Sequence, residues 1–432
     1  MRRDVGTHAT GRGRFVVSTF LLGNGISLLG NTLALVALPW FVLETTGSAG
    51  QTGVTGMAAA LPALASGVIG GVLVDRLGGR RMSVVSDLIS GVSVLLIPFL
   101  HITVGLAFWQ LLALVFLGAA LDIPGVTARR TLLPELAESG GMTDERMNSA
   151  FETMQGLTLI IGPVLAGVLI GWLGAVHLLW ITAATFAISA TLIGLFSPSG
   201  KHSEGRPEPA MSTGMIAEVM EGMRFLRTDS LLLTLAIGLT LMNFLFQPFW
   251  NVVLPVLIEE RYEMASRYGF VLTMFGLGNL IGGMAYGALG ARFRRYRRAV
   301  FLTGVLAFTL LLWVTFIDTQ FPVIAVAALL VGMLSGPINP LLVTVRFERI
   351  PKELRGRVFA TFSALSGAAA PLGMLSAGWL IEGLGPHRGV LALAITATIF
   401  TTGLWLARPY RLMNADGPVL EARSPSRAGA SD

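Results

Sequence analysis

The sequence predicts an all-α integral membrane protein with twelve transmembrane helices in two six-helix, pseudo-symmetric bundles. The first observation is composition: 53% of the 432 residues are hydrophobic and 13% are charged, and the mean hydropathy is +0.71. Soluble domains carry about 25% charged residues, so this chain is too apolar for water and its solvent must be lipid. The other two observations are the placement of basic residues and an internal repeat.

Twelve apolar stretches are long enough to cross a bilayer. A spanning helix needs about 20 mostly apolar residues, because every backbone amide in hydrocarbon must pair within its own helix. In chain order, and numbered helices 1 to 12 as predicted spans, the stretches are residues 15–43, 51–74, 82–103, 105–127, 154–175, 177–197, 230–257, 268–291, 299–317, 321–345, 357–382 and 387–407. The first is longer than the apolar core of a cleaved signal peptide, so we expect it to remain as a helix.

The basic residues predict the orientation of these helices. If the chain crosses alternately from an inside amino terminus, all but three of its 31 Lys and Arg fall on the inner side. Only Arg261, Arg267 and Arg388 fall outside. Basic residues near span ends mark the cytoplasmic side. The pattern therefore predicts a multi-pass protein of the cell membrane with both termini in the cytoplasm.

A polar break near the middle of the chain separates six spans from the next six, and it predicts a cytoplasmic linker. The predicted organisation is an N-terminal tail at 1–14, a bundle at 15–197, the linker at 198–229, a bundle at 230–407 and a C-terminal tail at 408–432. Because the number of spans is even, the two tails share one side.

A shift of 211 residues aligns glycines and arginines at equivalent points of the two halves. The aligned pairs include Gly71 with Gly282, Arg146 with Arg357, Gly162 with Gly373 and Gly167 with Gly378. Two duplicated bundles around a central site suit alternating access, in which the halves rock about the site.

Several classes of function are disfavoured. The chain has no Cys, and its five His are scattered without metal-ligand spacing, so we expect no metal and no cofactor. The basic residues are spread over every inner loop rather than gathered on one face, which argues against nucleic-acid binding. We find no cluster of catalytic side chains and no phosphate-binding loop of the G-x-x-x-x-G-K-[ST] type, which argues against an enzyme and an ATP-driven pump.

Two motifs resemble signatures of the Major Facilitator Superfamily. The turn after the second span contains Gly71, Asp75, Arg76, Gly78, Arg80 and Arg81. These residues resemble the loop 2 to 3 signature G-x-x-x-D-R-x-G-R-R, with Gly79 as an additional residue. The fifth span contains Gly162, Pro163 and Gly167, which resemble the antiporter motif of facilitator exporters.

Three further stretches are similar to the drug-efflux branch that includes macrolide efflux proteins and the enterobactin exporter: 128–136, 221–226 and 350–358. The resemblance covers about residues 15–407. It implies the major facilitator fold and the export of a bulky, partly apolar drug, antibiotic or secondary metabolite in exchange for protons. The implied partners are this small molecule, protons and membrane lipid, and the implied working unit is a monomer. An uptake facilitator or symporter of the same fold is the alternative.

The resemblance also implies a gate. Asp75 would face the start of helix 11 near Arg357, and Arg76 or Arg80 would reach Asp122 in helix 4. This network would close the cytoplasmic side in the outward-open state. The alternative is that these arginines only anchor the inner loops. For the helix 5 motif, the alternative is close packing that has no effect on transport.

Proton exchange requires a titratable group, and the chain offers few within the spans. Related exporters often carry Asp in helix 1 at the position of Asn31, which cannot titrate. The coupling candidates are therefore Asp87 and Glu152. The alternatives are a packing hydrogen bond for Asp87 and a helix-start charge for Glu152. If neither group titrates, the protein would be a facilitator.

Amide side chains within the spans predict the substrate cavity. The candidates are Asn24 and Asn31 in helix 1, Asn243, Gln247 and Asn251 in helix 7, and Asn339 in helix 10. The spacing places each helical set on one face. Two facing amide stripes would suit a neutral or weakly charged substrate, whereas hydrogen bonds between helices are the competing explanation.

Overall fold

The computed structural model describes residues 11–198, 214–317 and 320–414, and within them it leaves out the side chains of residues 65–72, 214–219 and 291. In this part of the chain all regular structure is helical. The predicted all-α membrane fold is therefore confirmed. The outer parts of the two predicted tails, before residue 11 and after residue 414, lie outside the described residues, as do linker residues 199–213.

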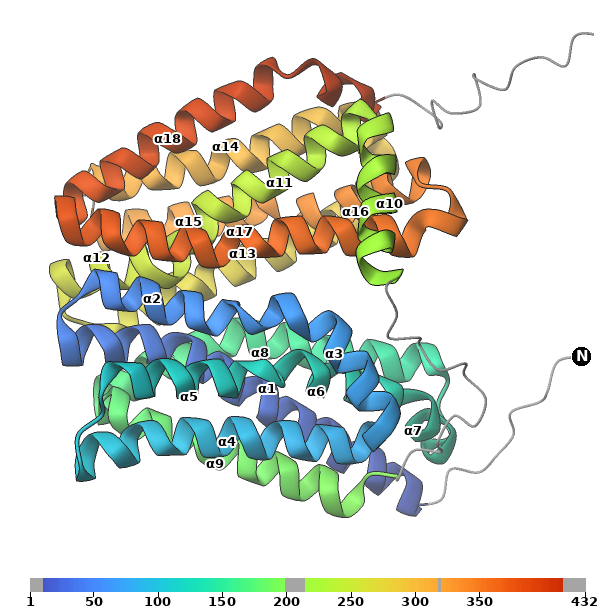
Figure 1. Ribbon diagram of the computed structural model, residues 1–432, viewed down its shortest axis with the longest axis vertical. Coiled ribbons are helices and arrows are strands. Elements are labelled where there is room, and N and C mark those ends of the chain that lie inside the picture. The colour runs from blue at the N-terminus through green and yellow to red at the C-terminus, as the bar shows by residue number, and fades with distance from the viewer. Residues whose placement is uncertain (1–10, 199–213, 318–319, 415–432) are drawn as a thin grey trace, which may run out of the picture.

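The helices form two groups that lie one above the other (Figure 1). The first group is α1 (Gly11–Thr46), α2 (Ala49–Ala60), α3 (Pro62–Leu77), α4 (Gly79–Thr103), α5 (Phe108–Ala120), α6 (Asp122–Thr131), α7 (Leu133–Gly140), α8 (Asp144–Leu173) and α9 (Ala175–Phe196). After the linker helix α10 (Gly214–Thr228), the second group is α11 (Ser230–Pro248), the π-helical turn η1 (Phe249–Val253), α12 (Leu254–Tyr262), α13 (Ala265–Phe293), η2 (Arg294–Tyr296), α14 (Arg297–Phe316), α15 (Phe321–Ser335), α16 (Ile338–Arg349), η3 (Lys352–Leu354), α17 (Arg355–Leu384), α18 (Pro386–Leu406) and η4 (Arg408–Asn414).

The second predicted span is broken into two helices. Eleven helical stretches of the described residues are individually long and apolar enough to cross a membrane. The span predicted at 51–74 is divided between α2 and α3 at Pro62, whose missing backbone N–H interrupts the helical hydrogen bonds. The two pieces together run from one end of the molecule to the other (Figure 1). They supply the twelfth span.

The two ends of the molecule differ in charge. The described chain ends, Gly11 and Asn414, lie with α10 at one end, which we call the linker end (Figure 1). The opposite end is called the far end. The far-end turns carry Arg261, Arg267 and Arg388, the three basic residues that the alternating topology assigns to the outside. The described structure thus separates the basic residues as the sequence predicts.

Two turns repeat the same backbone geometry in the two halves. Gly174 joins α8 to α9 with φ 83° and ψ 160°, and Gly385 joins α17 to α18 with φ 80° and ψ 158°. The shift of 211 residues that aligns the two halves also aligns these two glycines. A positive φ is readily accessible to glycine because it has no Cβ. Equivalent helix pairs are therefore connected by equivalent turns.

Candidate functional site

The two halves meet along two helix pairs, α8 with α13 and α2 with α17. Glycines make both contacts close. A Cβ atom added to Gly167 of α8 would lie 2.8 Å from the carbonyl oxygen of Ala265 in α13, and one added to Gly53 of α2 would lie 2.9 Å from the Cα of Gly378 in α17. Small residues let helix backbones approach each other in this way.

The helix 5 motif lies at the first of these contacts. A Cβ at Gly269 of α13 would collide with the carbonyl oxygen of Pro163, and Gly167 packs one turn further along α8. Gly162 points the other way, because its Cβ would lie 2.8 Å from the Cβ of Thr32 in α1. The motif therefore packs α8 against both halves at once.

Hydrogen bonds also join the halves. At the far end, Glu382 of α17 accepts hydrogen bonds from the Ser48 hydroxyl at 3.2 Å and from the Gly50 backbone N–H at 3.1 Å, at the start of α2. The start of a helix favours a negative charge. Further along α13, Thr273 donates to the carbonyl of Ile160 at 2.9 Å. The Glu382 contact could not be predicted from the sequence, because its partners are more than 300 positions away.

A cavity of about 460 Å³ lies beside the α8 and α13 contact. Most of its lining comes from the second half, and Leu35, Leu159 and Pro163 come from the first. The second half contributes Met242, Asn243, Phe246, Gln247, Trp250, Asn251, Tyr268, Leu272, Phe275, Gly276, Asn279, Phe308, Ser335, Ile338 and Asn339. None of these side chains is charged.

The amides of α11, η1 and α16 lie around one cavity. Asn243, Gln247, Asn251 and Asn339 all line the cavity. Two of them also bond to backbone: Asn243 Nδ2 donates to the Ser366 carbonyl at 3.1 Å, and Asn251 Nδ2 donates to the Gln247 carbonyl at 3.0 Å. The cavity and packing explanations therefore both apply to these two side chains.

The helix 1 amides lie elsewhere. Asn24 is fully buried inside the first half, within 3.5 Å of the Arg129 guanidinium, and Asn31 is half-buried and is absent from the cavity lining. The residue of α1 that reaches the cavity is Leu35. The predicted pair of facing amide stripes is therefore corrected to one stripe, because the charged groups described below hold Asn24 inside the first half.

Aromatic side chains form one wall of the cavity. Trp250 lies 4.3 Å from Phe275 and 6.1 Å from Phe308 between ring centroids, and Phe246 stacks on Phe308 at 4.9 Å. Phe275, Phe308 and the cavity residue Asn279 were not predicted from the sequence. Asn279 could have been predicted, because an amide is unusual in an otherwise apolar span. Phenylalanine is too common in such spans for Phe275 or Phe308 to be recognised.

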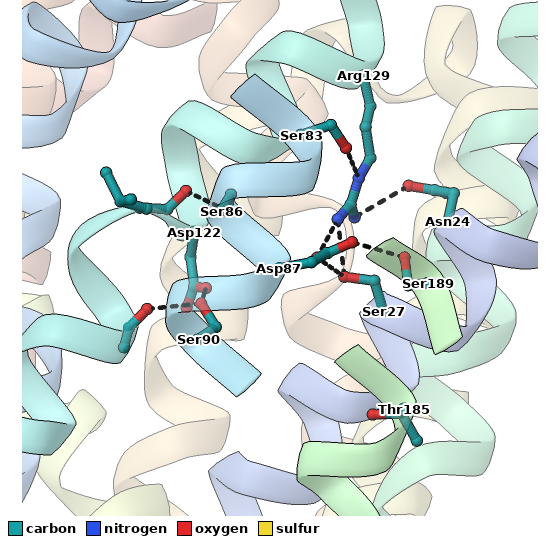
Figure 2. Close-up of polar contacts among 12 residues, drawn as sticks. Asn24, Ser27, Ser83, Ser86, Asp87, Ser90, Asp122, Arg129, Thr185 and Ser189 are labelled. Carbon is teal, nitrogen blue, oxygen red and sulfur yellow. Dashed lines mark hydrogen bonds and ion pairs between the residues drawn. The ribbon is translucent and has the colours of Figure 1, made fainter. Parts of the chain in front are cut away.

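A buried ion pair lies at the centre of the first half. Asp87 of α4 and Arg129 of α6 are both 2% exposed, and the Asp87 Oδ1 lies 2.5 Å from the guanidinium. Ser27 of α1 donates to the same oxygen at 2.8 Å, and Ser189 of α9 donates to the other at 2.6 Å (Figure 2). The pair therefore joins four helices.

The guanidinium of Arg129 is bound on its other sides as well. Its Nε donates to Ser83 Oγ at 2.9 Å, one terminal nitrogen donates to Ser27 Oγ at 2.9 Å, and the other points to Asn24 Oδ1 (Figure 2). Buried charges are tolerated when they are paired and hydrogen-bonded in this way. Asp87 thus has more contacts than the single packing hydrogen bond that the sequence suggests, and Arg129 was not among the candidates.

Glu152, the other coupling candidate, lies in a different setting. It forms an ion pair with Arg130 at 2.9 Å, and the two side chains are 55% and 49% exposed. Arg129 therefore forms a buried ion pair with Asp87, and its neighbour Arg130 forms an exposed ion pair with Glu152.

The glycine and arginine motif forms the end of α3 and the turn into α4. Gly78 joins these helices with φ 78°, a conformation that suits glycine. The additional residue Gly79 touches α6, since its Cβ would lie 2.8 Å from the Ala128 carbonyl oxygen. Gly71 lies within α3, in the stretch whose side-chain surroundings are not described.

The charged residues of this motif do not form the predicted gate pairs. Asp75, Arg76 and Arg81 are exposed, and Asp75 has no hydrogen bond or ion pair among the described residues. Arg80 donates a hydrogen bond to the Gly194 carbonyl of α9. The motif therefore contacts its own half in this conformation.

The predicted gate partners are bound to other groups. Asp122 accepts a hydrogen bond from Ser90 of α4 at 3.1 Å (Figure 2), and it forms no ion pair with an arginine of the motif in the described structure. Arg357 at the start of α17 pairs with Glu221 of the linker helix at 2.5 Å. The expected pairs are absent from this conformation, in which the halves are joined at the far end.

The described residues contain no group of three His, Asp or Glu side chains that could hold a metal ion. What the site offers is an uncharged cavity with amides and aromatic rings, bordered by the contact between two helix bundles. Such a site can bind a molecule by hydrogen bonding, stacking and apolar contact.

Comparison with known proteins gives consistent results. Residues 20–266 and 241–428 match the Major Facilitator Superfamily. The chain is 36% identical to the multidrug efflux pump Tap of Mycolicibacterium fortuitum, over 85% of this chain and 89% of the pump. It is 24% identical to macrolide efflux protein A of Streptococcus pyogenes, over 86% of this chain and 91% of that protein.

Solved structures share the fold at low sequence identity. The nucleoside transporter NupG matches with a TM-score of 0.74 and 13% identity, over 90% of this chain and 98% of its own. A D-xylose-proton symporter matches with a TM-score of 0.63 and 14% identity, over 91% of this chain and 98% of its own. Because the family match covers both halves of the chain, the chain belongs to the Major Facilitator Superfamily.

Proposed function

We propose that this protein is a secondary transporter that exports bulky, partly apolar small molecules from the cell. The observation that carries the proposal is the uncharged cavity of amides and aromatic rings beside the contact between the two halves. The printed names of the relatives, multidrug efflux pump and macrolide efflux protein, support export of drug-like compounds. We assign the linker end to the cytoplasm because nearly all basic residues lie there.

Transport by alternating access would require the two ends to open in turn. In this conformation Glu382 and the glycine contacts join the halves toward the far end. A substrate leaving on that side requires these contacts to separate. The proposed cycle is therefore a rocking of the two bundles, with the cavity as the site that is exposed to each side alternately.

The gate that the family resemblance implies would form in the outward-open state, when the far end is open. When the far end opens, we expect α3 to approach α17 at the linker end and Asp75 to meet Arg357. Arg357 would then exchange its partner Glu221 for Asp75. In the same step an arginine of the motif, Arg76 or Arg80, would turn toward Asp122.

For proton exchange we favour Asp87 over Glu152. Protonation of Asp87 would remove the charge that holds Arg129 and would weaken contacts among four helices. Protonation of Glu152 would release only an exposed pair, and such pairs contribute little. A proton at Asp87 can therefore alter the packing of the first half, as coupling requires.

The test of this function is an accumulation screen in cells with and without the protein, using a panel of drug-like compounds. We expect lower accumulation of some compounds in cells that contain the protein, and loss of this difference when the pH gradient is collapsed. In inverted vesicles the same compounds should be taken up. Uptake into intact cells would instead support an importer, and unchanged accumulation of every compound would refute the proposal.

Two variants test the residues assigned above. Asp75→Asn should reduce transport without reducing the amount of protein in the membrane, because it removes the gate charge. Asp87→Asn should abolish the dependence of transport on the pH gradient. Wild-type flux in Asp75→Asn would contradict the gate, and retained pH dependence in Asp87→Asn would contradict the coupling role.

A further inference from the structure

We propose that the cavity selects uncharged compounds with a flat ring system, and that Trp250 is the specificity-determining residue that contacts the ring. The inference rests on the proposed function, because it concerns the compound that occupies the same cavity. Its evidence is different, however: it comes from the local backbone of the second half and from the chemistry of the lining.

Two prolines place Trp250 on an irregular turn. Proline has no backbone N–H, so Pro248 and Pro255 each remove one hydrogen bond from the helix that continues from α11 to α12. Between them the chain forms the π-helical turn η1, in which the Leu254 N–H bonds to the Phe249 carbonyl five residues earlier. Such turns are rare and occur often at functional sites.

Tyr268 completes this turn. In the five-residue register the carbonyl of Trp250 would accept from the N–H of residue 255, which is a proline. The hydroxyl of Tyr268 donates to that carbonyl instead, at 2.9 Å. Tyr268 is fully buried, so its position is fixed by packing. It is a positioning residue that stabilises the backbone from which the Trp250 ring extends.

The ring of Trp250 belongs to the aromatic wall and remains partly exposed toward the cavity. Phe275 lies 4.3 Å from it, tilted by 33°, and Phe308 lies edge-on at 6.1 Å. Phe246 and Phe308 behind it are nearly buried. A flat ring that enters the cavity can therefore stack against Trp250 and Phe275, with the other rings supporting them.

The polar side of the cavity has unused hydrogen-bonding groups. The side chains of Gln247, Asn279 and Asn339 line it and form no hydrogen bond with the described residues. Each amide offers both a donor and an acceptor. A neutral compound that carries carbonyl, amide or hydroxyl groups would satisfy them, whereas no lining carboxylate or basic side chain is present to neutralise an ion.

The aromatic rings could in principle attract a cation through their faces. The charge of the lining favours the neutral compound. No lining side chain carries an opposite charge, and a charge that leaves water without an opposite charge is strongly disfavoured. The site should therefore prefer the uncharged member of a pair of compounds with the same shape.

The experiment measures binding to the purified full-length protein by equilibrium dialysis, with protein-free micelles as the blank. One pair of probes, 9-methylanthracene and 10-methylacridinium, has the same flat shape and differs in charge. A second pair, fluorenone and dodecahydrofluorenone, is uncharged and differs in flatness. We expect the flat, uncharged probe of each pair to bind about tenfold more tightly than its partner.

Variants assign the preference to the ring. Trp250→Leu should weaken fluorenone binding about tenfold and leave dodecahydrofluorenone binding nearly unchanged, while Trp250→Phe should retain most of the difference. Tyr268→Phe should reduce the same ratio by about threefold, because it frees the turn. The matched control is Trp172→Leu, which removes a tryptophan that is 81% exposed at the far end.

The outcomes separate this inference from the proposed function. Equal binding of 10-methylacridinium, no binding of the flat probes, or an unchanged ratio in Trp250→Leu would overturn the inference even if cells with the protein export other compounds. Conversely, a lack of export with the expected binding ratios would refute the transport direction and leave the inference standing.

Discussion

At the scale of single residues, Arg129 and Arg130 differ sharply in their surroundings. These neighbours point in different directions from α6: Arg129 is 2% exposed and bound to Asp87, whereas Arg130 is 49% exposed and paired with Glu152. Removing one partner of a buried ion pair leaves an uncompensated charge and costs about 3 to 5 kcal/mol. An exposed pair contributes about 0 to 1 kcal/mol.

We therefore expect Arg129→Met to lower the midpoint of thermal unfolding in detergent strongly, and Arg130→Met to leave it nearly unchanged. The double variant Asp87→Asn with Arg129→Met should recover part of the loss, because no buried charge then remains unpaired. Equal effects of the two single variants would show that Arg129 is not held in a buried ion pair.

Residues of the candidate site could be predicted from the sequence where their type is rare in apolar spans. Amides within helices 7 and 10 stand out, and Asn243, Gln247, Asn251 and Asn339 line the cavity. Arg129 did not stand out, because it sits in a basic stretch that resembles every other inner loop. The sequence contained one indication that Arg129 belongs to the site. It lies seven residues after Asp122, so both side chains are on one face of the helix.

At the scale of helices, the contact between α8 and α13 depends on the absence of side chains. A Cβ at Gly269 would meet the Pro163 carbonyl, whereas nothing lies within 4 Å of a Cβ at Gly287 on the same helix. Larger side chains at close helix crossings force backbone shifts that cost about 1 to 3 kcal/mol. On α13, Gly269 is therefore a position where a side chain would disrupt the contact, and Gly287 is its matched control.

We expect Gly269→Val to separate α8 from α13 and to reduce transport at least several-fold, while Gly287→Val leaves both unchanged. The separation can be measured as the distance between spin labels on cysteines introduced at the far ends of the two helices. The chain has no native Cys, so no background label has to be removed. An unchanged distance in Gly269→Val would refute the packing role of the helix 5 motif.

Helix boundaries were predictable where glycine or proline interrupts a span. They were less predictable where contacts with other helices determine the local backbone. Gly174 and Gly385 end equivalent helices with the same backbone angles. The division of one span into α2 and α3 follows from Pro62, although the apolar pattern alone reads as one helix. Apolar periodicity does not predict the π-helical turn. Pro248 and Pro255 mark where helical hydrogen bonds are lost, but Tyr268, which pairs the Trp250 carbonyl, comes from another helix.

At the scale of the whole molecule, the distribution of charge predicts which end faces the cytoplasm. Arg81 lies in the first turn of α4 at the linker end, and Arg388 lies at the start of α18 at the far end. Both side chains are exposed. The excess of basic residues at the linker end favours its retention in the cytoplasm.

In intact cells, a membrane-impermeant maleimide should label Arg388→Cys and should not label Arg81→Cys. After the membrane is permeabilised, both should react, which shows that each site is accessible. Labelling of Arg81→Cys from outside would reverse the orientation and, with it, the proposed direction of export.

The lipid environment, the twelve spans and the duplicated halves were predictable from the amino-acid sequence, because they follow from apolar length, charge placement and repeated glycines along the chain. Tertiary structure decided which polar groups face the cavity and which are sealed inside a bundle. Asn24 and Asn243 are both amides in apolar helices, yet one lies beside a buried arginine and the other lines the cavity. The difference arises from partners on other helices: Asp87 and Arg129 surround Asn24, whereas Asn243 shares its cavity with Phe275 and Phe308. The local sequence around each amide does not identify these partners.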